Sequence, residues 1–107
     1  MKILIVEPGK RPRRAEIDGS LQSMQKIVGG YIQAVYPWRE DLVALVCDED
    51  GLYKDTEWNR KISDHLVIKG TFFLCGISAE DFTDLPDDLM AKYSRLFRYP
   101  QFFVEAQ

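Results

Sequence analysis

The most informative segment of the chain is Lys69-Gly70-Thr71-Phe72-Phe73-Leu74-Cys75-Gly76. Its length suits a β-strand, and a glycine lies close to each end. The four residues 72–75 show no polar alternation, which is typical of a strand covered on both faces. We therefore place this segment at the centre of a small antiparallel sheet, with the other strands and two helices covering it.

Length and composition indicate one globular domain, residues 1–107, with 46% hydrophobic and 29% charged residues. The formal net charge of -3 gives the whole molecule no attraction for nucleic acid. No apolar run approaches the ~20 residues that span a bilayer, and the first seven residues turn acidic too soon for a signal peptide. Two cysteines inside apolar runs fit a reduced, cytoplasmic protein.

The N-terminal region predicts two paired strands around a basic connection. Residues 3–6 are mostly β-branched and are stopped by Pro8-Gly9, and residues 15–18 are expected to pair back on them. The connection favours a solvated hairpin tip, because like-charged runs usually face water, but a phosphate-binding loop stays open. Its cations are Lys10, Arg11, Arg13 and Arg14.

Two segments show helical spacing. Ser20 can cap a helix over residues 21–28, and Gly29-Gly30 then ends it. This glycine pair is not a phosphate cradle, because a cradle precedes its helix. Asp84 is expected to cap the final helix, with Pro86 in its first turn. The apolar positions of that helix are Leu85, Leu89, Tyr93 and Leu96.

The rest of the chain completes an α+β fold: a small, mostly antiparallel sheet of about five to six strands with two amphipathic helices. Asp50-Gly51 predicts a tight hairpin whose return strand begins at residues 52–53. Residues 78–81 indicate a turn or short helix, and residues 101–104 an edge strand or a packed tail. Further strands are expected at residues 31–36, 42–47 and 65–68, and a helical turn or irregular crossing at 56–62.

Two short clusters are candidates for binding. Asp48, Glu49 and Asp50 lack the alternating ligands of a calcium loop, so a solvated acidic turn is favoured. The triad Trp58-Asn59-Arg60 has the composition of an interface hot spot, in which Trp and Arg are over-represented. In the alternative interpretation, the tryptophan covers an edge of the core and the arginine pairs with an acidic neighbour.

The residues do not predict a catalytic, metal or cofactor site. His65 is the only histidine, and no spacing ties it to a nucleophile. Cys47, Cys75 and His65 would be three scattered zinc ligands without a C-x-x-C pair, so both thiols are expected to be buried small side chains. We therefore expect a protein that is not an enzyme.

Several blocks of the chain resemble a bacterial family of unknown function, DUF3846. They are residues 3–9, the block Ile27-Val28-Gly29-Gly30-Tyr31-Ile32-Gln33-Ala34-Val35-Tyr36-Pro37, residues 44–51, Asn59-Arg60 and residues 70–76. The resemblance extends to about Phe82, and the last helix and tail look more individual. It implies a small protein of phages, plasmids or conjugative elements in Firmicutes and related gut bacteria, without established catalytic residues.

That setting leads to two functional hypotheses. The first is a mobile-element protein that binds a host protein, as an anti-defence inhibitor of a Cas9-type or restriction nuclease. Its anchors would be Trp58, Asn59 and Arg60, and its acidic surfaces, around residues 48–50 and 80–88, would meet a basic channel. The alternative is a nucleic-acid-binding accessory protein that uses Lys10, Arg11, Arg13 and Arg14. Exposed sheet edges also leave a homodimer open.

Overall fold

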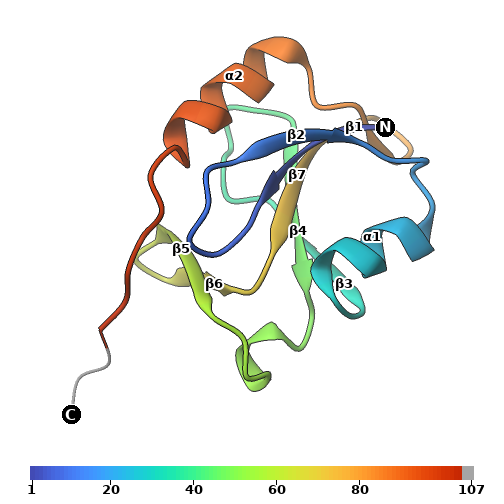
Figure 1. Ribbon diagram of the computed structural model, residues 1–107. Helices are drawn as coiled ribbons and strands as arrows, with labels where there is room; N and C mark the ends of the chain where they lie inside the picture. Colours follow the sequence, from blue (N-terminus) through green and yellow to red (C-terminus); the bar gives the residue numbers. More distant parts are fainter. Residues whose placement is uncertain (105–107) are drawn as a thin grey trace.

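The computed structural model describes residues 1–104, which form eight strands, two α-helices and one 3₁₀ turn (Figure 1). The helices are α1 (Leu21–Val28) and α2 (Asp87–Leu96), and the 3₁₀ turn is η1 (Gly51–Tyr53). Neither helix is long and apolar enough to cross a membrane. The strands are β1 (Lys2–Val6), β2 (Arg13–Glu16), β3 (Ile32–Val35), β4 (Val43–Asp48), β5 (Trp58–Ser63), β6 (Leu66–Lys69), β7 (Phe72–Ile77) and β8 (Phe82–Thr83).

β7 lies at the centre of the main sheet, as the sequence predicts. The strand order is β2-β1-β7-β4-β3, β8 pairs with β7, and every pairing is antiparallel. Leu74 of β7 lies opposite both Leu4 of β1 and Leu45 of β4. These pairings confirm the α+β fold.

The sheet is covered on both faces, because successive side chains of a strand point to opposite sides. Phe73 and Cys75 pack in the cluster that α1 closes with Met24 and Val28. Their neighbours Phe72 and Leu74 belong to the other cluster, which is closed by α2 and by the hairpin of β5 and β6. Burying each phenylalanine stabilises the fold by about 1.5–3 kcal/mol, which explains why this strand organises the sheet.

α1 begins and ends where the sequence predicts. The Ser20 hydroxyl accepts a hydrogen bond from the Ser23 amide at 3.1 Å, and Gly29 closes the helix with a φ of 85°. Asp18 accepts hydrogen bonds from the Ser23 hydroxyl and from the Ser20 amide. These bonds, chiefly the one from Ser23, lower the pKa of the Asp18 carboxyl to about 2.

α2 differs from the prediction at both ends. Its first residue is Asp87, and Asp84 does not cap it, because the Asp84 carboxylate accepts a hydrogen bond from the Lys2 amide at 2.8 Å. Leu96 is 58% exposed, so Met90, Tyr93 and Phe97 carry the buried face at the C-terminal end. The expected complement to the helix dipole remains, with acidic residues in the first turn and Arg95 in the last.

Of three other connections, the first departs from its expected boundary, the second is the expected turn, and the third is neither of the structures expected. β2 begins at Arg13, so Arg13 and Arg14 lie in the strand, opposite Ile5 and Leu4, and not in its turn. Residues 78–81 form a turn, in which the Ser78 hydroxyl accepts from the Asp81 amide, and the strand β8 follows it. Residues 101–104 are not a strand, and all four are exposed, so neither the edge strand nor the packed tail describes them.

The segment between β4 and β6 holds the main error of the sequence prediction. Asp50-Gly51 does not form a hairpin, because the Asp48 carboxylate accepts from the Asp50 amide and pairs with Lys54, and the chain makes the turn η1. Residues 56–62 are neither helical nor irregular, because they contain most of β5. Within the described part of the chain, β5 pairs only with β6, as a separate two-stranded sheet.

Candidate functional site

Asn59 lies in β5 and is fully buried. Its side-chain amide donates one hydrogen bond to the Val6 carbonyl at 2.9 Å and one to the Gly70 carbonyl at 2.8 Å. Its side-chain oxygen accepts from Nη1 of Arg60 at 2.9 Å. Asn59 therefore joins the β5–β6 hairpin to the end of β1 and orients its neighbour.

Arg60 is also fully buried, and it joins the hairpin to two further parts of the chain. Its Nη2 donates to the Lys10 carbonyl at 2.7 Å and to the Phe97 carbonyl at 2.9 Å. Burial lowers the pKa of Arg60, but a guanidinium starts near 12.5 and stays charged at neutral pH. The expected acidic partner is thus replaced by carbonyl and amide oxygens.

Of the three predicted anchors, only Trp58 reaches solvent, because Asn59 and Arg60 bind the chain's own backbone. The Trp58 ring lies 6.0 Å, centroid to centroid, from Phe103 in the tail. The Lys69 ammonium lies 5.4 Å from the Trp58 ring centroid. Trp58 is not among the partly buried residues that pack against either core cluster, so these contacts do not make it a cover for an edge of the core.

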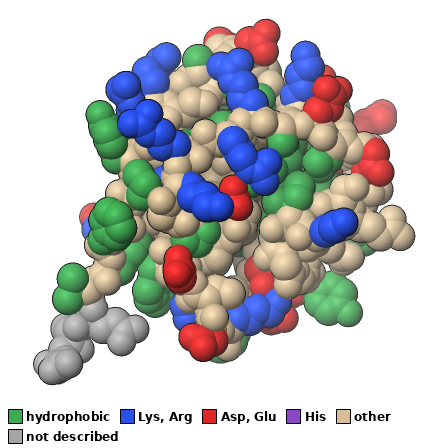
Figure 2. Space-filling model, viewed as in Figure 1, with side chains coloured by type: hydrophobic (Ala, Val, Ile, Leu, Met, Phe, Trp, Pro, Cys, Tyr) green, Lys and Arg blue, Asp and Glu red, His purple; other side chains and the backbone are tan. Residues whose placement is uncertain are grey.

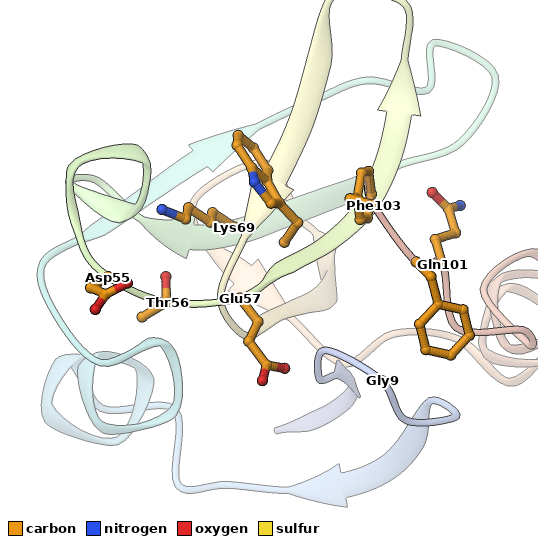
Figure 3. A pocket seen from close by; sticks show the side chains of 9 residues that line it. Gly9, Asp55, Thr56, Glu57, Lys69, Gln101 and Phe103 are labelled. Carbon is orange, nitrogen blue, oxygen red and sulfur yellow. The ribbon is translucent and has the colours of Figure 1, made fainter. Parts of the chain in front are cut away.

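A cavity of about 440 Å³ opens beside Trp58 (Figure 3). Phe102 and Phe103 line it from the tail, and Asp55 and Glu57 line it from the segment before β5. In Figure 3, Gly9 of the β1–β2 connection lies across from the hairpin. We call Asp55, Glu57, Trp58, Phe102 and Phe103 the acidic–aromatic surface.

The predicted acidic cluster at residues 48–50 is divided by the fold. Asp48 is buried and pairs with Lys54 at 2.6 Å, whereas Glu49 and Asp50 are exposed. Within residues 1–104, Asp55 and Glu57 form no ion pair, so their charges are available to a partner. The second predicted acidic region, residues 80–88, lies around β8 and the start of α2.

The predicted basic residues lie along the β1–β2 hairpin. Arg13 pairs with Glu7 at 2.9 Å. Lys10, Arg11 and Arg14 are exposed and form no ion pair with any carboxylate of residues 1–104. The hairpin interpretation of this region therefore holds, although its cations extend into β2.

The structure does not bring Cys47, Cys75 and His65 together. Cys47 packs on the α2 face of the sheet, Cys75 on the α1 face, and His65 is exposed in the turn between β5 and β6. Burial raises the pKa of Cys47 to about 11 and that of Cys75 to about 12. Among the described residues, no group of three or more His, Cys, Asp or Glu side chains is placed to hold a metal ion.

A polar contact that the sequence analysis missed fixes α2 to the loop before β4. The Tyr93 hydroxyl donates to the Asp41 carboxylate at 2.7 Å, and the Lys92 ammonium donates to the same oxygen at 2.6 Å. These bonds, the one from Lys92 above all, lower the pKa of Asp41. A tyrosine at a buried helical position was the available signal, because a buried hydroxyl usually has a partner.

A comparison with known families identifies the family of this chain. Residues 1–98 match the family described as Domain of unknown function (DUF3846). The chain belongs to the DUF3846 family. The match continues through α2, beyond the residue Phe82 at which the resemblance was expected to end. No curated protein and no solved structure shows a significant match.

The DUF3846 match divides the acidic–aromatic surface. Asp55, Glu57 and Trp58 lie inside residues 1–98, together with the whole β1–β2 hairpin. Phe102 and Phe103 lie beyond the matched residues. A test of this surface should therefore examine Trp58 and the tail separately.

Proposed function

We propose that this DUF3846 protein is a non-enzymatic binding protein of a mobile element that acts by contact with a host protein. The resemblance to proteins of phages and conjugative elements supports the setting. The acidic–aromatic surface supports the mode of action. It combines aromatic side chains that reach solvent with carboxylates that the described chain leaves unpaired.

The observation that carries the proposal is the exposure of aromatic area around the cavity. Phe102 is 88% exposed, and Trp58 is half-buried with its ring 6.0 Å from Phe103. Tryptophan is enriched among the few residues that supply most of the binding energy of an interface, and these residues fill pockets at its centre. The cavity would receive a side chain of the partner.

The charge of this surface selects a basic partner. Asp55 and Glu57 border the cavity together with one cation, Lys69, and Glu49 and Asp50 add exposed carboxylates on the preceding turn. Complementary charge speeds encounter and fixes orientation more than it adds affinity. A host nuclease of the Cas9 or restriction type offers such a surface in its basic nucleic-acid channel, and we place this encounter in the cytoplasm.

A nuclease inhibition assay with captured host proteins tests the proposal. The tagged full-length chain is incubated with host lysate at physiological salt, and the retained proteins are identified and assayed as nucleases. We expect the wild-type chain to retain a nuclease and to slow its cleavage of DNA. Trp58→Ala should weaken the complex at least tenfold, because truncating a hot-spot residue costs about 2 kcal/mol or more.

Tyr36→Ala serves as the matched control, because Tyr36 is an exposed aromatic residue that directly follows β3 and lies outside the acidic–aromatic surface. This variant should bind like the wild type. If Trp58→Ala and Phe102→Ala both retain full inhibition, or if no nuclease is inhibited, the proposal fails.

The protein would also be able to form a homodimer through an edge of its main sheet. β3 is an edge strand with no charged residue, whereas the opposite edge strand, β2, carries Arg13, Arg14 and Glu16. Uncharged edges pair more readily with another chain. A homodimer would therefore form through β3, and sedimentation of wild-type protein and of Gln33→Lys would detect it as a loss of the dimer in the variant.

A further inference from the structure

A second surface carries charge of the opposite sign. The exposed cations Lys10, Arg11, Arg14, Arg95 and Arg98 form no ion pair within residues 1–104, and we call them the basic face. Figure 2 shows Lys and Arg side chains gathered over the β1–β2 hairpin and the end of α2. Among the paired cations, Lys54 and Lys61 belong to other elements, whereas Arg13 of β2 pairs with Glu7 and Lys92 of α2 pairs with Asp41.

Buried Arg60 explains why residues far apart in sequence share this face. One nitrogen of its guanidinium, Nη2, donates to the carbonyls of both Lys10 and Phe97. The tip of the β1–β2 hairpin is therefore held against the end of α2, where Arg98 follows. Arg60 also adds its own charge beneath the face, since its hydrogen-bond partners among residues 1–104 are uncharged oxygens.

Carboxylates border the basic face but do not fill it. Glu7 forms an ion pair with Arg13. Glu16 and Asp87 line a cavity together with Arg14, between β2 and the start of α2. The net charge of -3 arises from acidic residues elsewhere, on the turn after β4 and around β8. A polyanion that follows the hairpin to the end of α2 would meet cations along its path.

Tyr99 adds an aromatic surface at the end of this path. Its ring is 67% exposed, and the Arg98 guanidinium lies 5.5 Å from the ring centroid. Proteins that bind single strands combine a cationic track with aromatic rings on which bases stack. Duplex recognition instead places a helix or strand pair in a groove, and both helices here pack on the sheet.

We propose that the basic face binds single-stranded nucleic acid, with phosphates on its cations and a base stacked on Tyr99. This surface is separate from the acidic–aromatic surface and goes beyond the proposed function. The negative net charge restricts the contact to this face. Binding should therefore be weak at physiological salt and should strengthen steeply as the salt concentration falls.

Fluorescence anisotropy with a labelled 20-nucleotide oligothymidylate tests the proposal on the full-length chain. A contact with roughly four phosphates gives a slope of about -3 for log K against log salt. The triple variant Arg11→Gln, Arg14→Gln and Arg98→Gln should reduce the magnitude of that slope by about 2 and weaken binding at least tenfold at low salt. Tyr99→Ala should weaken binding without changing the slope.

The matched control is Lys26→Gln, Arg39→Gln and Lys61→Gln, which changes net charge by the same amount at exposed positions outside the basic face. It should bind like the wild type, and thermal melting checks that both triple variants are folded. Equal losses in both triple variants, or no binding at low salt, would overturn the proposal.

Two competitors test the class of ligand. A 20-base-pair duplex that binds as tightly as the oligonucleotide and is indifferent to Tyr99→Ala would exclude single-strand recognition. Polyglutamate that competes as well as the oligonucleotide would assign the face to an acidic protein. Trp58→Ala should leave oligonucleotide binding unchanged, so the outcome is independent of the host-protein proposal.

Discussion

The two hairpins of this protein are held in the fold by different means. The β1–β2 hairpin belongs to the main sheet, where β1 pairs with β7 through backbone hydrogen bonds. The β5–β6 hairpin has no strand pairing with that sheet. It is attached by apolar side chains such as Ile68, and by the buried side chains of Asn59 and Arg60.

This difference assigns a structural task to two residues that look like surface anchors in the sequence. An isolated two-stranded hairpin is marginally stable in water, so the β5–β6 hairpin depends on its attachment. Asn59 and Arg60 provide hydrogen bonds to β1, to the β1–β2 connection and to the end of α2. The same bonds position both candidate surfaces, since Trp58 precedes Asn59 and Lys10 accepts from Arg60.

The largest effect is expected from Arg60→Ala. The substitution leaves the Lys10 and Phe97 carbonyls and the Asn59 side-chain oxygen without their donor. Because unsatisfied buried acceptors each cost about 1–3 kcal/mol, we expect a loss of about 4 kcal/mol in the free energy of unfolding. Urea denaturation followed by circular dichroism measures it.

Arg14→Ala is the control within the other hairpin, because Arg14 is exposed and unpaired within residues 1–104. Surface changes of this kind stay within about 0.5 kcal/mol. Similar losses in the two variants would mean that the hairpins do not differ in their dependence on arginine.

A smaller loss is expected from Asn59→Ala, about 3 kcal/mol, because two hydrogen bonds to backbone carbonyls disappear and Nη1 of Arg60 loses its side-chain acceptor. Asn59→Asp refines the test, because a carboxylate still accepts from Arg60 but donates nothing to Val6 or Gly70. We expect this variant also to be destabilised in urea denaturation. Wild-type stability of Asn59→Asp would show that the Arg60 contact alone attaches the hairpin.

The comparison also explains how far the sequence predicts the fold. Phe72 to Cys75 identify the central strand because burial on both faces leaves a continuous apolar run. β5 was missed because it is attached by polar side chains, and Asn59 and Arg60 give no apolar signal. The turn η1 is not predicted for a similar reason. It depends on the pairing of Asp48 with Lys54, and local sequence does not specify that pairing.

The candidate surfaces were predictable in part. The hairpin cations were visible as a run of like charge, but Arg95 and Arg98 join them only through the folding of α2 against the hairpin. The residue type of Trp58 predicts an anchor, but its cavity is completed by Phe102 and Phe103 of the tail. The tertiary contacts of buried Arg60 bring these charges together. Residue spacing in the sequence does not predict such contacts.

The smallest effect, a local one, is expected at the two cysteines. Cys47 lies at the end of β4 beside Val67 and Ile68 of the β5–β6 hairpin, whereas Cys75 is covered by α1 on the opposite face. Separation of this hairpin would expose Cys47 and leave Cys75 covered. We therefore expect Cys47 to react faster than Cys75 with an aromatic disulfide reagent under native conditions, and the ratio to rise further in Arg60→Ala.

The reaction is followed at pH 8 in the single-cysteine variants Cys47→Ala and Cys75→Ala. Burial raises the pKa of Cys47 from 9.0 to about 11, so the folded state disfavours the reactive thiolate and reaction proceeds through opening. Above pH 9 the unfolded state loses the proton first, and stability falls until about pH 11, which is why the measurement stays below that range. Equal rates for the two thiols would mean that the β5–β6 hairpin separates only when the whole domain unfolds.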